Sequence, residues 1–310
     1  MIRIQILKTE EIPADPTLIA DAETKALEKL IDAENATWRT RAKNETERFR
    51  IAKKYLDNAE FWGDIKGVYM RLQANKCAYC EQKLEDKKIV HDVEHFRPKG
   101  SVKVWLTKSR KAQHKLDFPD APSDLGYYLL PYHPLNYVTA CKQCNSSLKS
   151  NCFPIAGSRL LDNDDFSVIN KSEKPFLPFP LGHVDEDAPE DLISFVGVVP
   201  VINPELTDEH KKLRAHVTIK FFNLDKLRET LIKQRCKVIK DVYEAIEFVN
   251  NSNNPLMVEQ KKEDLRQLTA GKEAHTNCAV SFYKLCLNDT AKAREHWIAA
   301  NEYIRNHPEK

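Results

Sequence analysis

The chain has 310 residues, of which 42% are hydrophobic and 30% charged, a balance typical of folded globular proteins and not of disordered ones. Lysine and arginine outnumber aspartate and glutamate by only two (48 against 46), so bulk charge alone does not indicate a nucleic-acid partner. The 8 glycines form neither a G-x-x-x-x-G-K-[ST] nor a G-x-G-x-x-G motif, which argues against nucleotide binding.

The chain is expected to be cytoplasmic, without a membrane segment. No apolar run approaches the ~20 residues that a spanning helix needs, and the N-terminus lacks a signal-peptide pattern. The 8 cysteines are then expected in a reducing compartment, where Cys-x-x-Cys pairs bind metal more often than they form disulfides.

Residues 1–75 are predicted to be an N-terminal helical region that follows one short strand. Alternating Ile2, Ile4 and Ile6 favour the strand. Apolar residues then recur at helical spacing over residues 18–58 and 61–72, in a pattern typical of core packing.

Residues 76–165 are predicted to contain the functional core, held together by two Cys-x-x-Cys pairs that bind one metal ion. The four cysteines of these pairs are Cys77, Cys80, Cys141 and Cys144. A two-residue gap lets both sulfurs of a pair reach one ion, and two pairs complete a tetrahedron, so we predict a structural Zn²⁺. Two redox-active or buried pairs are the alternative, which would not account for the polar residues between them.

Those polar residues are Glu94, His95, Asn136 and Asn145, and they suit phosphodiester hydrolysis. A neutral histidine with an ordinary pKa of about 6.5 can accept a proton from attacking water at cellular pH, which is the role expected of His95. Glu94 and Asn145 offer an oxygen-only site that favours Mg²⁺ or Mn²⁺. Asn136 is expected to tether the loop that carries His95 or to orient its ring. The alternative is a structural histidine beside a zinc site that only binds.

A basic segment follows His95 and is interpreted as an insertion over residues 101–125. Seven basic residues and no acidic residue lie between His95 and Leu116. Beside a nuclease site this pattern favours phosphate contacts, and a solvated loop is the alternative. Arg97, Lys99 and Lys149 are the predicted nucleic-acid contacts.

Residues 166–310 are predicted to be a proline-rich connector followed by a C-terminal helical region. Frequent prolines argue against long helices before residue 207, where one strand or hairpin is expected over Ile193–Val201. Helices are expected near residues 208–220, 224–250, 256–270, 272–287 and 290–306. The predicted fold is therefore mostly α, with a few short strands.

The motifs resemble those of HNH endonucleases with the ββα-metal fold. In that family a [DE]-H pair ends the first strand, an asparagine lies in the loop, and a histidine or asparagine follows the second Cys-x-x-Cys. By this resemblance His95 would be the general base, Asn136 the middle asparagine, and Glu94 and Asn145 ligands of the catalytic ion. Asn145 stands where the family name implies histidine, which leaves an oxygen ligand in that place.

Residues 60–235 also resemble, in segments such as GYYLLPYHPLNYVTACKQCN (126–145), the PtuB-like nucleases of Septu and retron defence operons. The resemblance implies an SMC/ABC-type ATPase partner. We therefore expect a metal-dependent endonuclease that cleaves DNA or RNA in bacterial defence. The alternative is a zinc-dependent module that binds nucleic acid or a partner without catalysis.

Overall fold

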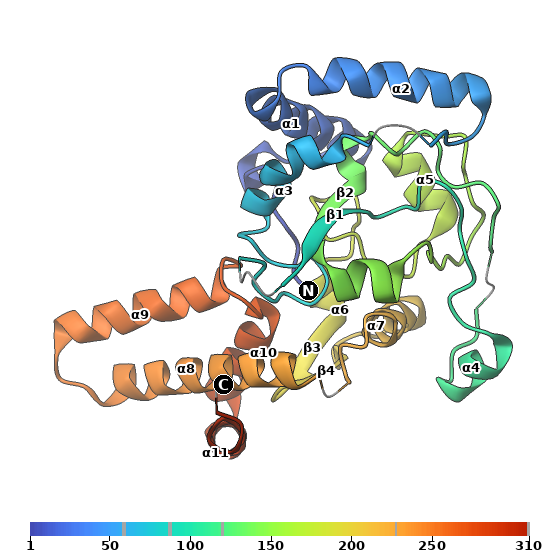
Figure 1. Ribbon diagram of the computed structural model, residues 1–310. Helices are drawn as coiled ribbons and strands as arrows, with labels where there is room; N and C mark the ends of the chain where they lie inside the picture. The colour runs from blue at the N-terminus through green and yellow to red at the C-terminus, as the bar shows by residue number, and fades with distance from the viewer. Residues whose placement is uncertain (58–59, 86–88, 119–120, 227, 309–310) are drawn as a thin grey trace.

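The computed structural model describes residues 1–57, 60–85, 89–118, 121–226 and 228–308, and most of the secondary structure in them is helical (Figure 1). The N-terminal region contains three α-helices: α1 (Ile19–Glu34), α2 (Trp38–Ala52) and α3 (Lys66–Leu72). Short 3-10 turns precede α1 and α3, at Pro16–Leu18 and Trp62–Ile65. The expected helical N-terminal region is thus present.

The strand expected from Ile2, Ile4 and Ile6 is reduced to one bridge. Ile4 pairs in parallel with Leu181, and its backbone bonds reach Pro180 and Gly182. Gly182 has a φ of +67°, so the partner chain turns away after one residue and cannot extend the ladder. The prediction of a regular strand here was wrong.

Two short strands form the sheet that organises residues 76–165. Strand β1 (His91–His95) pairs antiparallel with β2 (Tyr137–Cys141), so that His91 faces Cys141 and His95 faces Tyr137. A 3-10 turn (Pro134–Asn136) precedes β2, and a π-helical segment, η5 (Gln143–Lys149), follows it. In chain order this is strand, strand, helix.

In the described residues, the basic insertion and the connector contain only short elements. Helix α4 (Lys108–Gln113) lies in the basic insertion, and α5 (Phe166–Glu173) and α6 (Pro189–Leu192) lie in the connector. Strands β3 (Ile193–Val196) and β4 (Val199–Ile202) form an antiparallel hairpin, as expected for that stretch. Its turn is made by Gly197, whose φ of +57° favours glycine.

The C-terminal region is helical, as expected. Its helices are α7 (Glu209–Phe221), α8 (Glu229–Asn251), α9 (Pro255–Thr269), α10 (Thr276–Asn288) and α11 (Thr290–Asn306). Helix α8 packs against α9, α10 and α11. Figure 1 shows α8 and α9 side by side, extending away from the sheet as an arm. In the described part of the chain, no helix combines the length and apolar character required to cross a bilayer.

A cluster of buried apolar side chains runs through all the predicted regions. It includes Leu27 and Trp38 from the N-terminal helices, Tyr137 from β2, and Val242 and Cys278 from the C-terminal helices. The three-region division at residues 75 and 165 stays a prediction, since this core crosses both boundaries.

A buried carboxylate joins α1 to the connector. Glu23 has no solvent exposure, and it accepts hydrogen bonds from the backbone N–H of His183 (2.7 Å) and from its ring Nδ1 (3.1 Å). Burial raises the pKa of Glu23 from 4.5 to about 7. The folded state therefore holds the proton of Glu23 more tightly than the unfolded chain does.

This difference predicts a pH-dependent stability. Below pH 4.5 Glu23 is protonated in both states, and its contribution to the free energy of unfolding is complete. That contribution is lost as the pH rises from 4.5 through about 7, and it amounts to about 3 kcal/mol. Across this pH range, the free energy of unfolding measured with urea should change less with pH for Glu23→Gln than for the wild type. The exposed variant Glu10→Gln should keep the wild-type profile. Parallel profiles for wild type and Glu23→Gln would contradict the assignment.

Candidate metal centre and adjoining polar site

The four predicted zinc ligands converge. The sulfurs of Cys77, Cys80, Cys141 and Cys144 all lie within 4.8 Å of one another, and all four residues are buried. The Sγ atoms of Cys80 and Cys141 are 3.9 Å apart, far beyond the ~2.05 Å of a disulfide. Sulfurs around a tetrahedral zinc with Zn–S bonds of about 2.3 Å lie about 3.8 Å apart. The set can therefore hold one zinc ion.

The backbone brings the two pairs together. Cys77 and Cys80 lie in a turn before β1, whereas Cys141 ends β2 and Cys144 lies in the first turn of η5. Gln73 attaches the turn to β2, because its side-chain amide donates to the carbonyl of Thr139 (2.8 Å) and accepts from its N–H (2.7 Å). No local sequence signal marks Gln73, since only the fold brings it beside a residue 66 positions away.

The cluster favours a cation electrostatically. Burial raises the pKa of the Cys77 thiol, whereas hydrogen bonds from the other three sulfurs, Cys144 first, lower the pKa of Cys141. Cys141 can therefore carry a negative charge within the buried four-cysteine cluster, and a bound metal ion would neutralise that charge.

His95 ends β1 as a buried, neutral ring. Its Nε2 lies 3.0 Å from the carbonyl oxygen of Pro131, so Nε2 carries the hydrogen and Nδ1 is left as the acceptor. The ring packs edge-on against Trp62 (centroids 4.7 Å apart) and Tyr137 (5.2 Å). Burial, aided by the nearby Lys99 charge, lowers the pKa of His95 to about 3. The ring is neutral as expected, but its pKa is lower than the ordinary value expected from sequence.

Asn136 fastens the turn that follows His95. It is fully buried, its Oδ1 accepts from the N–H of Arg97 (2.8 Å), and its Nδ2 donates to the carbonyls of Arg97 (3.0 Å) and Leu130 (3.1 Å). The backbone of Phe96 also donates to the carbonyl of Asn136 (2.9 Å). In the described residues these bonds go to the loop and none to the His95 ring, and the tethering role of Asn136 stays a prediction.

Glu94 and Lys149 form a buried ion pair. The ammonium of Lys149 faces Glu94 Oε1 and also donates to the carbonyl of His95 (2.8 Å). Lys149 has no solvent exposure and Glu94 has 6%. Burial raises the pKa of Glu94, and the charge of Lys149 opposes that rise. Lys149 thus connects the end of η5 to the end of β1.

Asn145 lies one helical turn before Lys149. The spacing of four places both side chains on the same face of η5, and Lys149 on that face reaches Glu94. Within the described ranges, no hydrogen bond is recorded to the Asn145 side chain or to Glu94 Oε2. Two such oxygen donors fit a hydrated divalent ion. In the same ranges, no hydrogen bond or ion pair joins the His95 ring to Glu94 or Asn145, and the convergence of all three side chains on one ion or phosphate stays a prediction.

Arg97 is committed to an internal network. It is fully buried, its Nε lies 3.0 Å from Glu173 Oε2, and it donates to Asn170 Oδ1 (2.5 Å). The carboxylate of Glu173 also accepts from the hydroxyl of Tyr127 (2.7 Å). The expectation that Arg97 and Lys149 contact phosphate is not supported by these placements, because both cations are enclosed and paired with carboxylates.

Lys99 remains at the surface beside His95. Its ammonium pairs with Glu60 Oε1 (2.5 Å) and lies 3.8 Å from the centre of the Trp62 ring, and the side chain is 24% exposed. Surface ion pairs of this kind are weak, so an incoming phosphate can compete with Glu60. Of the three predicted contacts, Lys99 alone keeps solvent access.

The basic insertion presents further exposed cations. Lys103, Arg110 and Lys115 are exposed. Trp105 packs on Phe221 (centroids 4.9 Å apart) and stacks on Phe118 (6.3 Å). The insertion is therefore anchored by its aromatic residue, while its charges face solvent.

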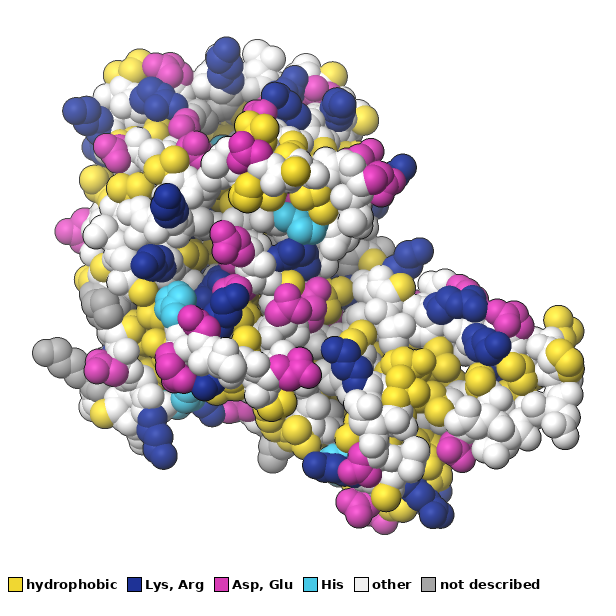
Figure 2. Space-filling model, turned by 180° about the vertical axis from the view of Figure 1, so that it is seen from behind, with side chains coloured by type: hydrophobic (Ala, Val, Ile, Leu, Met, Phe, Trp, Pro, Cys, Tyr) yellow, Lys and Arg dark blue, Asp and Glu magenta, His cyan; other side chains and the backbone are white. Residues whose placement is uncertain are grey.

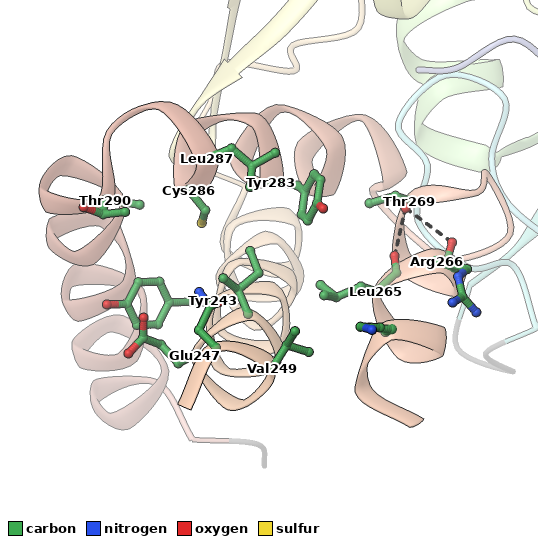
Figure 3. A pocket seen from close by; sticks show the side chains of 14 residues that line it. Tyr243, Glu247, Val249, Leu265, Arg266, Thr269, Tyr283, Cys286, Leu287 and Thr290 are labelled. Atoms are coloured by element: carbon green, nitrogen blue, oxygen red, sulfur yellow. Dashed lines mark hydrogen bonds between the residues drawn. The ribbon is translucent and has the colours of Figure 1, made fainter. Parts of the chain in front are cut away.

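A separate cavity of about 620 Å³ lies between α8, α9, α10 and α11 (Figure 3). Tyr243, Leu265, Tyr283 and Leu287 contribute to its lining, with Glu247 on one side. Figure 2 shows apolar side chains gathered on the arm at this end of the molecule. None of the predicted site residues lines this cavity.

We expect one zinc ion per chain, measurable by elemental analysis. Cys144→Ser should lose the ion, and its thermal unfolding should no longer be cooperative. The reason is that structural zinc contributes on the order of 10 kcal/mol, comparable with the ~5–15 kcal/mol stability of a whole domain. Cys152→Ser, outside the cluster, should keep both zinc and stability. Full zinc content in Cys144→Ser would contradict the four-sulfur site.

Comparison with known proteins gives one informative likeness. No family model matches the chain, and no solved structure matches it. A curated protein, "Septu protein PtuB" of Bacillus mycoides (strain KBAB4), is 27% identical over 180 residues. The match covers 57% of this chain and 52% of the relative, so the chain spans about half the length of that protein. The likeness supports a relation to Septu-associated proteins.

Proposed function

We propose that this chain is a metal-dependent endonuclease of the HNH type. The observation that carries the proposal is the order β1, β2, η5 around a four-cysteine cluster, with a neutral His95 at the end of β1 and Nδ1 free to accept a proton. Under this proposal the three elements are the ββα-metal core, and the cysteines hold structural Zn²⁺.

In the proposed reaction His95 Nδ1 takes a proton from the water that attacks phosphorus. The bond from phosphorus to the 3′-oxygen breaks, and this oxygen leaves with a proton from solvent. Its low pKa keeps the ring unprotonated before substrate binds, and a phosphate anion beside the ring would stabilise the imidazolium once it forms. Glu94 and Asn145 would hold Mg²⁺ or Mn²⁺, which supplies positive charge to the phosphate when bound. Asn136 keeps the loop after His95 in place. The resemblance to HNH enzymes implies 5′-phosphate and 3′-hydroxyl ends.

Nucleic acid would approach over the exposed cations of Lys99 and the insertion. This binding should weaken with added salt, because each phosphate contact releases a counterion. DNA and RNA are both candidate substrates.

The experiment compares cleavage of plasmid DNA and RNA with Mg²⁺, Mn²⁺ or EDTA. We expect ion-dependent cleavage that falls by ~10²–10⁴-fold in His95→Ala, the usual contribution of a general base. His307→Ala, at the end of α11, should cleave like the wild type. A folded, zinc-loaded His95→Ala protein that cleaves at full rate would refute the base assignment.

The second candidate is a zinc-dependent module that binds nucleic acid or a partner without cutting. The observation that favours it is that, within the part of the chain that the structure describes, no hydrogen bond or ion pair links the His95 ring to Glu94 or Asn145. Retained nucleic-acid binding with no ion-dependent cleavage, in both the isolated chain and its native complex, would favour this candidate.

We further propose that the chain acts in the cytoplasm as the nuclease subunit of an anti-phage defence system, with an SMC/ABC-type ATPase. The likeness to a Septu protein supports the defence role, and the ATPase follows from the resemblance. A tagged chain expressed with its neighbouring genes should co-purify with an ATPase at a fixed ratio, also after nuclease treatment of the lysate. Elution of the tagged chain alone would contradict the partnership.

A further inference from the structure

Lys149 is an internal cation at the junction of η5 and β1. Its ammonium is fully buried, pairs with Glu94 Oε1, and donates to the carbonyl of His95 (2.8 Å). The same helical segment holds Cys144 in its first turn. One side chain therefore links the four-cysteine cluster to both residues of the Glu-His pair.

A buried ammonium is costly and must be compensated. Removing a charge from water costs several kcal/mol unless it gains a counter-ion and hydrogen bonds. A methionine of similar length would fill the same volume without this cost. What the lysine adds is specific: it pairs with one carboxylate oxygen and donates a hydrogen bond to one carbonyl.

The two contacts leave defined groups available. Since Lys149 faces Oε1, Oε2 is the oxygen of Glu94 to which no hydrogen bond is recorded in the described ranges. The carbonyl of His95 belongs to the residue whose ring is held between Trp62 and Tyr137. A shift of this carbonyl would therefore also move the His95 ring.

We propose that Lys149 is a positioning residue, which orients Glu94 toward a divalent ion and fixes the backbone of His95. This inference rests on the proposed nuclease site and assigns Lys149 a role distinct from phosphate binding. Two other roles make different predictions. A phosphate contact would affect nucleic-acid binding and leave ion affinity unchanged. A lysine that takes the place of the ion would, when removed, increase ion affinity.

The test measures ion binding and the His95 ring without relying on cleavage. Mn²⁺ affinity is followed by electron paramagnetic resonance, and the ¹⁵N resonances of the His95 imidazole are assigned by their loss in His95→Gln. We expect Lys149→Met to keep its zinc, to bind Mn²⁺ at least ~10-fold more weakly, and to shift the His95 resonances. Lys149→Arg, which keeps the charge, should retain most of the Mn²⁺ affinity and give His95 resonances close to those of the wild type. Lys142→Met, exposed at the start of the same segment, should match the wild type.

Unchanged His95 resonances and Mn²⁺ affinity in zinc-loaded Lys149→Met would overturn the inference, as would tighter Mn²⁺ binding. If Lys149→Met does not fold, Lys149→Gln removes the charge that faces Glu94 but keeps a hydrogen-bond donor, and unchanged Mn²⁺ affinity in zinc-loaded Lys149→Gln would also overturn it. A different measurement tests the proposed nuclease function. If that function is wrong, the wild type does not cleave nucleic acid, whereas the His95 resonances report on the role of Lys149 whether or not the protein cleaves.

Discussion

The convergence of four buried sulfurs is the constraint on which the rest of the site depends. Cys77 and Cys80 come from a turn, and Cys141 and Cys144 from β2 and η5, so one ion bound there would join three segments. Every polar residue of the candidate site is attached to these segments. Glu94 and His95 lie on the strand paired with β2, Asn136 directly precedes β2, and Asn145 and Lys149 lie on η5. A sheet of two short strands has little stability of its own, which makes the ion central.

Charge around this site is divided between the interior and the surface. Arg97 and Lys149 are enclosed and satisfy Glu173 and Glu94. The removal of one partner of such a pair leaves an uncompensated buried charge, so these cations support the architecture. Lys99 and the exposed cations of the insertion remain for an external anion. A basic residue close to the Glu-His pair in sequence is therefore not necessarily exposed to an external anion.

Local sequence patterns predicted those elements that depend on interactions between residues close together in the sequence. Cys-x-x-Cys spacing predicted the metal cluster, helical periodicity predicted the C-terminal helices, and the glycine in the apolar stretch before Val201 fits the observed hairpin turn. The failures involve distant partners. Arg97 meets Glu173 across 76 positions and Lys149 meets His95 across 54, distances over which spacing carries no information. Of the alternating isoleucines at the N-terminus, Ile4 forms a single β-bridge, with Leu181, because Gly182 turns the neighbouring segment away.

X-ray absorption at the zinc K-edge can show whether the four sulfurs hold one ion. A four-cysteine site should give a single shell of four sulfur atoms at about 2.3 Å from zinc in the purified protein. A shell containing nitrogen or oxygen ligands, or protein that is folded and free of zinc, would contradict it. Either result would remove the support on which the placement of β1, β2 and η5 around His95 depends.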